Sequence, residues 1–403
     1  MNRDCPSVGF VSVDAQGYWP GGRYYIHHLM RCVALLPEHE RPLMRDVWWL
    51  EKDEKDSSFD DVRGLMAPSA VVRPPRTMFA RLLRKISRLV EDRGDFGDLF
   101  RRVGVDALFP TTTCEKPGVP LIYWVPDFQH KRRADLFTPR VQQWFEDNFA
   151  RKVADAELVL LTSRDAFADF LHYFPQDAAK ARLLLCPSVP QSDWFALDPD
   201  ATARRHGLDD VYFIISNQLT EHKNHLTVFE AVRRLKARGE RVQVACTGHS
   251  LDYKGQDHAR RLEQFVIDHD LGDHIRLLGF LPRAEQMALL RGARAIVHPS
   301  LFEGWSSPVE DAKSLGRPLI VSDIPIHREK LDGVIATVVD PNDAQAWADA
   351  LLAAKANPPQ ISKADEAAAL ERTQARALEA GRAFAAILRE AVARDASRRE
   401  RSP

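Results

Sequence analysis

Residues 295–318 read AIVHPSLFEGWSSPVEDAKSLGRP, and this stretch decides the fold class because all of its local signals agree. Ala295–His298 is a short apolar run with β-branched residues, which predicts a buried strand. The residues that follow it, among them Glu303, predict a loop at the carboxyl end of that strand. A carboxylate in such a loop, close to backbone N–H groups, suits the binding of sugar hydroxyls.

A short helix is predicted directly after this loop. Ser307 can cap it, Pro308 suits its first position, and Glu310 completes a capping box with Ser307. Gly316 is typical of the position just beyond a helix end, so the helix is predicted at about Pro308–Leu315. Its free N–H groups and its dipole favour a phosphate or another anion at the N-terminus.

Short apolar runs alternate with helical patterns along nearly the whole chain. Such alternation predicts parallel sheets covered by helices on both faces. The strands are predicted, in chain order, at Val8–Val13, Asp46–Leu50, Ala107–Phe109, Leu121–Val125, Leu158–Leu161, Arg182–Cys186, Val211–Ile215, Val242–Cys246, Ile275–Leu278, Ala295–His298, Leu319–Val321 and Ala336–Val339. Two sets of about six strands favour an α/β protein with two Rossmann-like domains facing each other across a cleft, rather than one barrel.

A proline-rich stretch, Pro187–Pro199, breaks this rhythm and predicts the linker between the two domains. The predicted domains are therefore residues 1–190 and residues 191–365. An Ala-, Glu- and Arg-rich segment at 366–396 predicts a helix that packs back toward the N-terminal domain. Residues 397–403 are predicted to be a frayed tail.

The composition excludes several classes of protein. The chain has 403 residues, of which 45% are hydrophobic and 28% charged, as is typical of globular domains. Its 56 Lys and Arg balance 57 Asp and Glu, so a general polyanion binder and a nucleic-acid partner are not expected. No apolar run approaches transmembrane length and no signal-peptide pattern is present, which predicts a cytoplasmic location. The five cysteines are scattered without a C-x-x-C, which suits a reducing compartment.

Two further groups of residues follow predicted strands, where ligands of α/β domains bind. Asn217, Gln218 and Lys223 come after the strand Val211–Ile215, and the pair Gly21-Gly22 comes after the first strand. The chain contains neither G-x-G-x-x-G nor G-x-x-x-x-G-K-[ST]. The sequence therefore does not favour a dinucleotide-binding oxidoreductase or a P-loop protein.

The loop and helix of the opening stretch resemble the signature of retaining glycosyltransferases of family 4, which have the two-domain GT-B fold. The matching residues are Glu303, Gly304, Trp305, Pro308 and Asp311. The resemblance implies that Glu303 contacts the transferred sugar near its anomeric centre and that Asp311 binds the ribose hydroxyls of the nucleotide. Asp311 stands where the family has Glu, and Ser306 stands where it has Gly. A shorter carboxylate still hydrogen-bonds a diol.

The resemblance extends to the other two loops. Lys223 matches a family lysine that neutralises the donor diphosphate, whereas Gln218 takes the place of its arginine partner, so one positive charge is missing. The glycine pair matches a family loop that lies beneath the donor phosphates, where no side chain stands in the way. The donor-binding residues implied in this way are Gly21, Gly22, Asn217, Gln218, Lys223, Gly304, Ser306, Ser307 and Asp311.

The family often carries a functional histidine in the N-terminal domain, commonly as His-Asp. Here residues 124–131 read WVPDFQHK. Pro126 takes the place of the histidine, Asp127 keeps the acid, and His130 follows three residues later. The resemblance therefore implies a catalytic set of Glu303, His130 and Asp127. The alternative for His130 is an ordinary histidine in a surface loop.

The resemblance implies a retaining glycosyltransferase that needs no metal or other cofactor. It would move a hexosyl group, with mannose as the first guess, from a nucleoside-diphosphate sugar to a glycan or lipid-linked acceptor. GDP-mannose is the first donor to consider and a UDP-hexose the second, as in bacterial surface polysaccharide biosynthesis. Residues 191–365 would then bind the nucleotide sugar and residues 1–190 the acceptor. The alternatives are a sugar-nucleotide epimerase of the same fold and a catalytically degenerate, sugar-nucleotide-binding partner subunit.

One local patch departs from the neutral overall charge. Residues 62–90 contain seven basic residues and no acidic residue. Within them, residues 77–90 predict a basic amphipathic helix, which suits an anionic membrane surface and a peripheral location at the inner face of the membrane. A core-facing helix with a solvated basic side is the alternative.

Overall fold

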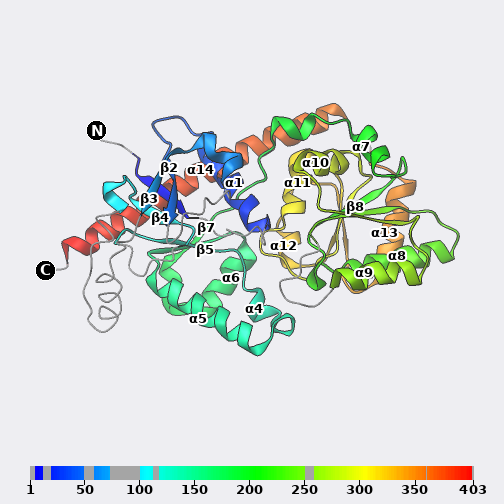
Figure 1. The fold of residues 1–403 in the computed structure, drawn as a ribbon, viewed down its shortest axis with the longest axis horizontal. Coiled ribbons are helices and arrows are strands. Elements are labelled where there is room, and N and C mark those ends of the chain that lie inside the picture. Colours follow the sequence, from blue (N-terminus) through cyan, green and yellow to red (C-terminus); the bar gives the residue numbers. More distant parts are fainter. Residues whose placement is uncertain are drawn as a thin grey trace. The chain divides into compact units, whose positions relative to one another are not determined.

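The computed structural model describes seven segments of the chain. These are residues 5–11, 20–49, 59–72, 100–111, 118–249, 258–359 and 361–401. The chain divides into two compact units, each built on parallel β-strands (Figure 1). Unit 1 comprises Met1–Pro126, Trp144–Cys186 and Arg376–Pro403, and unit 2 comprises Asp127–Gln143 and Pro187–Ala375.

Unit 1 contains two hydrogen-bonded groups of parallel strands, with the orders β3-β2-β1-β4 and β5-β6-β7. A bridge between Leu108 and Leu121 brings β4 beside β5. The strands are β1 (Ser7–Val11), β2 (Leu43–Trp49), β3 (Ala67–Val72), β4 (Ala107–Phe109), β5 (Ile122–Val125), β6 (Leu158–Leu161) and β7 (Ala181–Leu183). The helices described here are α1 (Pro20–Ala34), α6 (Arg164–Tyr173) and α5 (Pro139–Asp155), the last of which begins in unit 2.

Unit 2 contains a six-stranded parallel sheet with the order β10-β9-β8-β11-β12-β13. Its strands are β8 (Phe213–Ser216), β9 (Val244–Thr247), β10 (Ile275–Gly279), β11 (Ile296–His298), β12 (Leu319–Ser322) and β13 (Ala336–Val339). Its helices are α4 (Gln129–Arg132), α7 (Pro199–Arg205), α8 (His225–Ala237), α9 (His258–Asp268), α10 (Arg283–Gly292), α11 (Ser307–Leu315), α12 (Pro325–Arg328) and α13 (Ala344–Ala356).

The sheet of unit 2 is buried on both faces. Phe213 and Ile215 of β8 pack with Phe229 of α8 in one core, whereas Ile214 packs with Leu289 of α10 in the other. Successive side chains of a strand point to opposite faces, so an unbroken apolar run requires a helical cover on each side. The loops at the ends of the strands are therefore the part of this sheet that a ligand can reach.

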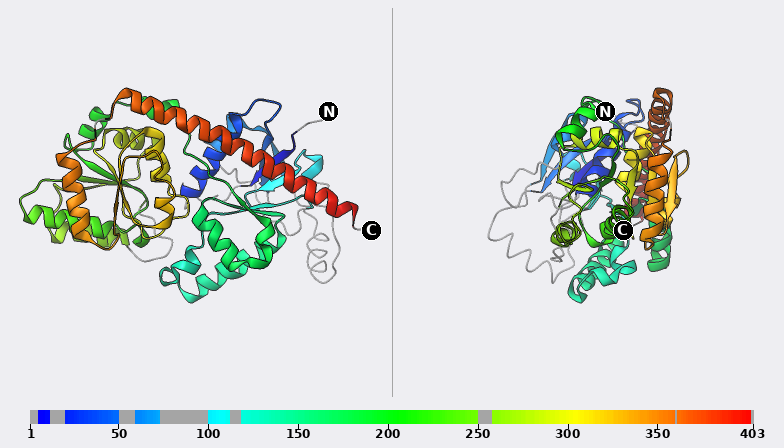
Figure 2. Two further views of the ribbon diagram at one scale, coloured as in Figure 1. Left: turned by 180° about the vertical axis from the view of Figure 1, so that it is seen from behind. Right: turned by 90° about the vertical axis from the view of Figure 1, so that its right-hand side faces the viewer.

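The C-terminal helix α14 (Lys363–Glu400) is a single uninterrupted helix (Figure 2). In unit 1, the ring of Phe384 packs edge-on against that of Phe109 at 5.2 Å. The prediction of a frayed tail from residue 397 is wrong, because helix α14 continues to Glu400. Asp395 binds Arg398 and Arg399 at 2.9 and 2.7 Å, and these pairs one turn apart stabilise the last turns.

The α/β architecture with parallel sheets is confirmed, and each predicted strand overlaps an observed one. Strand β3 was not predicted, because Pro68 and Ser69 interrupt its apolar pattern. The chain passes into unit 2 at Pro187, and Asp127–Gln143 groups with unit 2, whereas one uninterrupted segment at 1–190 was predicted. The basic helix predicted at 77–90 lies outside the described residues.

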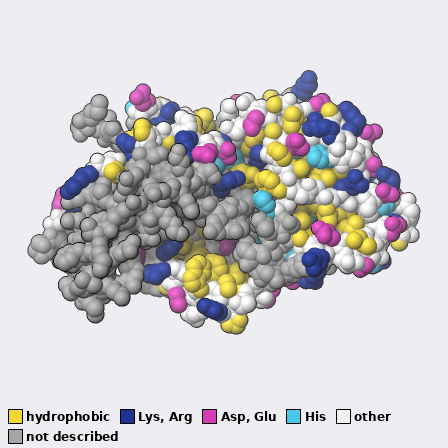
Figure 3. Space-filling model, in the orientation of Figure 1, with side chains coloured by type: hydrophobic (Ala, Val, Ile, Leu, Met, Phe, Trp, Pro, Cys, Tyr) yellow, Lys and Arg dark blue, Asp and Glu magenta, His cyan; other side chains and the backbone are white. Residues whose placement is uncertain are grey.

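The described surface carries both signs of charge. On the face drawn in Figure 3, basic and acidic side chains of the described residues are interspersed, in keeping with a net charge of −1. No helix in the described part of the chain is both long enough and apolar enough to cross a membrane.

Candidate active site

The order of strands in unit 2 places a candidate site at one point. From β8 the chain continues outward through β9 and β10 on one side, and then returns to build β11, β12 and β13 on the other. Ligands of open α/β sheets bind at the carboxyl ends of the two strands where the order reverses. Here these strands are β8 and β11, and the loops that follow them are residues 217–224 and 299–306.

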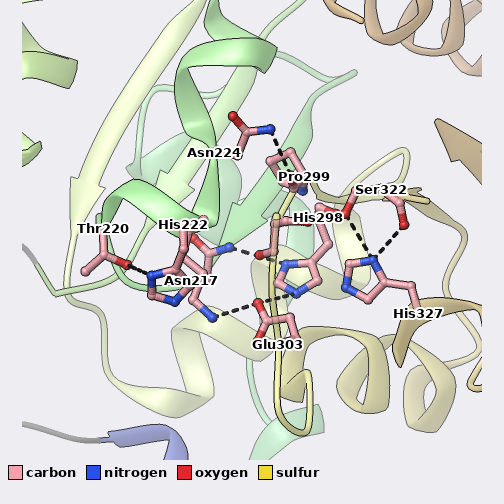
Figure 4. Close-up of polar contacts among 11 residues, drawn as sticks. Asn217, Thr220, His222, Asn224, His298, Pro299, Glu303, Ser322 and His327 are labelled. Carbon is pink, nitrogen blue, oxygen red and sulfur yellow. Dashed lines mark hydrogen bonds and ion pairs between the residues drawn. The ribbon is translucent and has the colours of Figure 1, made fainter. Parts of the chain in front are cut away.

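Hydrogen bonds tie these two loops to each other. The N–H of Leu301 donates to the carbonyl of His222 at 2.8 Å. The side-chain amide of Asn224 donates to the carbonyl of Pro299 at 3.1 Å (Figure 4). It also donates to the carbonyl of Pro341 at 2.8 Å. Asn224 has a positive φ of 59°, a conformation that asparagine tolerates better than most residues. The loops therefore form one hydrogen-bonded structure.

Glu303 lies at the centre of this structure and is only 8% exposed. The ammonium Nζ of Lys223 donates to its Oε1 at 2.6 Å. The Nε2 of His298 lies 3.0 Å from the same oxygen (Figure 4). Lys223 comes from the loop after β8, and His298 is the last residue of β11. The structure thus brings together two predicted site residues, Glu303 and Lys223, and adds His298.

Glu303 carries its charge within the protein. Burial by itself would raise the pKa of this carboxyl, but the charges of Lys223 and His298 and their hydrogen bonds hold the pKa well below its ordinary value of 4.5. The carboxylate is therefore ionised throughout the physiological range of pH. An ionised carboxylate next to an ammonium group can bind sugar hydroxyls and stabilise a neighbouring positive centre.

Helix α11 begins differently from the prediction. Ser306, and not Ser307, is its N-cap, and the side chain of Ser306 makes no capping hydrogen bond. Ser306 lies in the left-handed region at φ 60° and ψ 68°. The predicted capping box is wrong, because the Glu310 carboxylate instead accepts a hydrogen bond from Lys330 at 2.6 Å in a buried ion pair. The predicted end is confirmed, with Gly316 left-handed at φ 63°.

Asp311 is buried at 2% exposure on the same helix. Its Oδ1 accepts hydrogen bonds from the Ser188 hydroxyl at 2.5 Å and from the Arg283 guanidinium at 2.6 Å. The sequence left Asp311 available for a ligand, whereas the structure engages one of its two oxygens. No described residue donates to its Oδ2.

Several buried polar atoms around the two loops have no hydrogen-bond partner among the described residues. They are Asn217 Oδ1, His298 Nε2, Ser300 Oγ, Ser306 Oγ and His327 Nε2. Buried polar atoms in folded proteins are nearly always satisfied by protein, water or ligand. These atoms are therefore candidates to contact a polar ligand or ordered water at the carboxyl ends of β8, β11 and β12.

The remaining predicted donor-binding residues lie partly in unit 2 and partly in unit 1. Gln218 is half-buried in the loop after β8, and Gly304 and Ser307 flank the start of α11. Gly21 and Gly22 belong to unit 1 and lie in the first turn of helix α1. The prediction that they form a loop is therefore wrong.

The segment around His130 forms the short helix α4. The Oδ1 of Asp127 accepts a hydrogen bond from the N–H of Gln129 at 2.9 Å at the start of this helix. His130 is 3% exposed, which excludes an ordinary surface histidine. The guanidinium of Arg132 lies over the ring of Phe302, 5.6 Å from its centroid, so α4 contacts the loop that carries Glu303.

Sequence reasoning missed the residues that hold the acidic groups in place. These are His298 for Glu303, Ser188 and Arg283 for Asp311, and Lys330 for Glu310. His298 had a readable signal, because it is a polar residue at the carboxyl end of an otherwise apolar strand. The described residues contain no group of three or more His, Cys, Asp and Glu side chains arranged to hold a metal ion.

The part of the chain that carries this site is similar to known proteins. Residues 200–371 match the sequence model of a family described as glycosyl transferases group 1, and this range contains both loops and helix α11. The O-antigen chain mannosyltransferase RfbU of Salmonella typhimurium is 36% identical over 107 residues, which are 27% of this chain and 30% of that protein. O-antigen chain mannosyltransferase B of Escherichia coli is 38% identical over 72 residues, 18% of this chain and 19% of that protein. The chain thus matches about a third or less of the length of these two relatives.

The fold is shared with solved structures. The crystal structure of Anabaena HepE in complex with UDP and glucose superimposes with a TM-score of 0.61 at 16% sequence identity. The similarity covers 96% of this chain and 98% of that one. A similarity at this level of identity establishes the α/β fold of the whole described chain.

Proposed function

Because residues 200–371 match the sequence model of the family of glycosyl transferases group 1, we propose that this chain is a member of that family and transfers a hexosyl group from a nucleoside-diphosphate sugar. The proposed acceptor is a glycan or a lipid-linked glycan of bacterial surface polysaccharide biosynthesis. The two mannosyltransferase relatives support mannose as the sugar, and with it GDP-mannose as the donor. A UDP-hexose is the second donor to test.

The observation that carries the proposal is the ionised Glu303 paired with Lys223 where the strand order reverses. The ammonium group of Lys223 has three N–H donors. One of them donates to Glu303, so the others remain able to donate to a diphosphate. The unpartnered oxygens of Ser300 and Ser306 lie in the same loop region and suit a polyhydroxylated ligand. Asp311 keeps Oδ2 for a ribose hydroxyl while Ser188 and Arg283 hold Oδ1.

The proposed reaction retains the anomeric configuration. The bond between the anomeric carbon and the diphosphate oxygen breaks as the acceptor oxygen attacks the same face, and the leaving phosphate takes the acceptor proton. Lys223 stabilises the negative charge that develops on the diphosphate, and Glu303 stabilises the positive charge at the anomeric carbon. No residue of the chain is needed as a base, and the proposal requires no metal.

The first experiment is calorimetric titration, in EDTA, with GDP, UDP, ADP, dTDP and their common sugar conjugates. We expect one nucleotide to bind selectively. Lys223→Ala should weaken it about 10-fold or more, as for the loss of a charge-assisted hydrogen bond worth about 2 kcal/mol. The exposed Lys363, changed to Ala, is the matched control and should leave the affinity unchanged. Failure of every nucleotide to bind at millimolar concentration would overturn the proposal.

A transfer assay with the selected donor then tests the reaction. We expect Glu303→Ala to abolish transfer while nucleotide binding persists. Conversion of the nucleotide sugar without any acceptor would instead identify an epimerase. Nucleotide binding without turnover, unaffected by Glu303→Ala, would identify a degenerate partner subunit.

A further inference from the structure

Arg283 connects helix α10 with the carboxylate of Asp311 on helix α11. It is the first residue of α10, and its side chain is only 17% exposed. Its Nη2 donates to Oδ1 of Asp311 at 2.6 Å, and the Ser188 hydroxyl donates to the same oxygen at 2.5 Å. Since no described residue donates to Oδ2, the carboxylate is held through one oxygen and presents the other.

Two further contacts fix the guanidinium of Arg283. Its Cζ lies over the buried ring of Trp194, 4.7 Å from the ring centroid. Its Nη1 donates at 2.8 Å to Oε1 of Gln286, which lies three residues further along α10. The guanidinium is therefore held on one face by an aromatic ring and at one edge by an amide, in addition to its ion pair with Asp311.

The amide of Gln286 extends this network to the central sheet. A guanidinium donates hydrogen bonds and accepts none, so the oxygen of the amide faces Arg283 and its nitrogen points the other way. That nitrogen, Nε2, donates at 2.5 Å to the hydroxyl of Ser216, the buried last residue of β8. The network thus runs from the carboxyl end of β8, where the strand order reverses, to Asp311.

The segment that opens unit 2 at Pro187 supplies the remaining supports. Ser188, which donates to Asp311, is fully buried, and Trp194 lies six residues further along. Three parts of unit 2 therefore act on one oxygen of Asp311: this segment, helix α10 and, through Gln286, the end of β8. Such a network restricts the rotation of the carboxylate and thereby directs its second oxygen.

A carboxylate oxygen directed in this way suits a pair of neighbouring hydroxyls. Each oxygen has two lone pairs, so Oδ2 of Asp311 can accept hydrogen bonds from both hydroxyls of a cis-diol. A site built to bind a hydroxyl rejects the analogue that lacks it, because a polar group of the site is then left unpaired. Ribose carries a 2′,3′-cis-diol, whereas 2′-deoxyribose lacks the 2′-hydroxyl.

We propose that Arg283 is a positioning residue that sets the nucleotide specificity: by holding Asp311 through Oδ1, it directs Oδ2 to the cis-diol of a ribose. The donor is then a sugar conjugate of a ribonucleoside diphosphate, and not of a 2′-deoxyribonucleoside diphosphate such as dTDP. This inference rests on the proposed function, in which Asp311 binds a ribose hydroxyl, and it narrows the class of donor.

Calorimetric titration in EDTA with two pairs of probes, GDP with 2′-deoxy-GDP and UDP with 2′-deoxy-UDP, tests the proposal. We expect the wild-type protein to bind the ribonucleotide of the selected base about 10-fold more tightly than its deoxy counterpart. Arg283→Met should reduce this ratio to within about threefold of unity and leave the affinity for the deoxynucleotide unchanged. Ser188→Ala, which removes the other donor to Oδ1, should also lower the ratio.

The matched control is Arg291→Met. Arg291 lies on the same helix and donates to the carbonyls of Trp194 and Leu197, but its described contacts do not include Asp311. This variant should keep the wild-type ratio.

An equal loss of affinity for both nucleotides in Arg283→Met would overturn the inference, because Arg283 would then act on the diphosphate or on the fold in general. A wild-type ratio near unity would also overturn it, while nucleotide binding and the proposed function would stand. If Arg283→Met does not fold, a wild-type ratio in Ser188→Ala overturns it. If the wild-type protein binds neither GDP nor UDP, the proposed function fails and the inference fails with it.

Discussion

Glu303 stabilises the folded chain because its charge is compensated inside the protein. Although burial opposes ionisation, Lys223 and His298 hold the pKa of Glu303 well below 4.5. A carboxyl group whose pKa is lowered by folding stabilises the fold above its unfolded pKa, and the stabilisation is lost as the pH falls through the folded pKa. The contribution of Glu303 is therefore complete at neutral pH and declines only below pH 4.5.

We expect Glu303→Gln to lower the free energy of unfolding by about 3 kcal/mol at neutral pH, because the change leaves Lys223 partly buried without its counterion. The difference from wild type should shrink as the pH falls below 4.5, because the carboxyl of the unfolded chain then binds protons while that of the folded chain stays ionised to lower pH. Urea unfolding from neutral pH to about pH 3 measures both effects. The exposed Glu263, changed to Gln, should alter stability by less than about 0.5 kcal/mol. A difference that stays constant with pH would contradict the lowered pKa.

Ser306 is held in a backbone conformation that favours glycine. Its φ of 60° and ψ of 68° cost a residue with a Cβ about 1 kcal/mol, and its buried hydroxyl has no partner among the described residues. We expect Ser306→Gly to be more stable than Ser306→Ala by about 1 kcal/mol in thermal or urea unfolding. Ser307, the first residue of α11, has helical geometry. There the order should reverse, with the Ala variant the more stable.

Local sequence identified two central residues of the candidate site but not the residues that hold the site together. Glu303 and Lys223 were predicted, and the structure joins them at 2.6 Å. Glu310 was assigned to a capping box from its spacing to Ser307. In the structure its carboxylate instead accepts a hydrogen bond from Lys330, 20 residues further along the chain. Spacing along a helix is visible in a sequence, whereas a contact such as Arg283 with Asp311 depends on how two helices pack.

The two site loops depend on one asparagine. Asn224 occupies the N-cap position of helix α8 with φ 59°, and its side-chain amide donates to the carbonyls of Pro299 and Pro341. It therefore connects the loop after β8 with the loops after β11 and β13. The distance between Lys223 and Glu303 is set by this connection, and not by the ion pair alone.

We expect Asn224→Ala to lower the free energy of unfolding by about 2–3 kcal/mol, because it leaves two carbonyls unsatisfied and places alanine at positive φ. Asn224→Gly should recover the backbone part of this loss, about 1 kcal/mol, but not the hydrogen bonds. Urea unfolding compares the variants, and the exposed Asn342, changed to Ala, is the control. An Asn224→Ala protein as stable as the control would show that the loops are held by other contacts.

Strands and helices were predictable because their patterns are local. All twelve predicted strands overlap observed ones, since continuous apolar runs are typical of sheets buried on both faces. The pair Gly21-Gly22 was placed in a loop because it matches a family loop after the first strand, yet it forms the first turn of α1. Preferences of single residues yield to the packing of the helix as a whole, where Tyr25, Ile26 and Leu29 are fully buried.

At the scale of the molecule, the division into units could be predicted only in part. The proline-rich stretch marks the passage into unit 2 at Pro187, because proline ends regular structure. The return of the chain to unit 1 at Arg376 lies in the middle of helix α14, where no sequence signal marks it. The inclusion of Asp127–Gln143 in unit 2 likewise follows from tertiary contacts, such as Arg132 on Phe302.

The packing of α14 on α1 in unit 1 depends on a residue without a side chain. Gly381 is buried, and a Cβ at this position would overlap with the backbone carbonyl of Cys32 on α1. Glycine has a low helix propensity, so replacing a glycine in a helix interior by alanine ordinarily stabilises the protein by about 1 kcal/mol. Here the effect on stability should have the opposite sign, because the Cβ would meet backbone atoms of α1 and not the end of a flexible side chain, and a shift of α14 would disturb the contact of Phe384 with Phe109.

We expect Gly381→Ala to lower the free energy of unfolding by about 2 kcal/mol or more, the cost of an overpacked helix contact. Ala386→Gly, at an exposed position five residues further along the same helix, should cost only the propensity of about 1 kcal/mol. Thermal and urea unfolding of the two variants gives both values. A Gly381→Ala protein more stable than wild type would mean that α14 does not approach α1 as closely as the backbone indicates. The helix would then be held to unit 1 mainly by surface pairs such as Arg382 with Glu40.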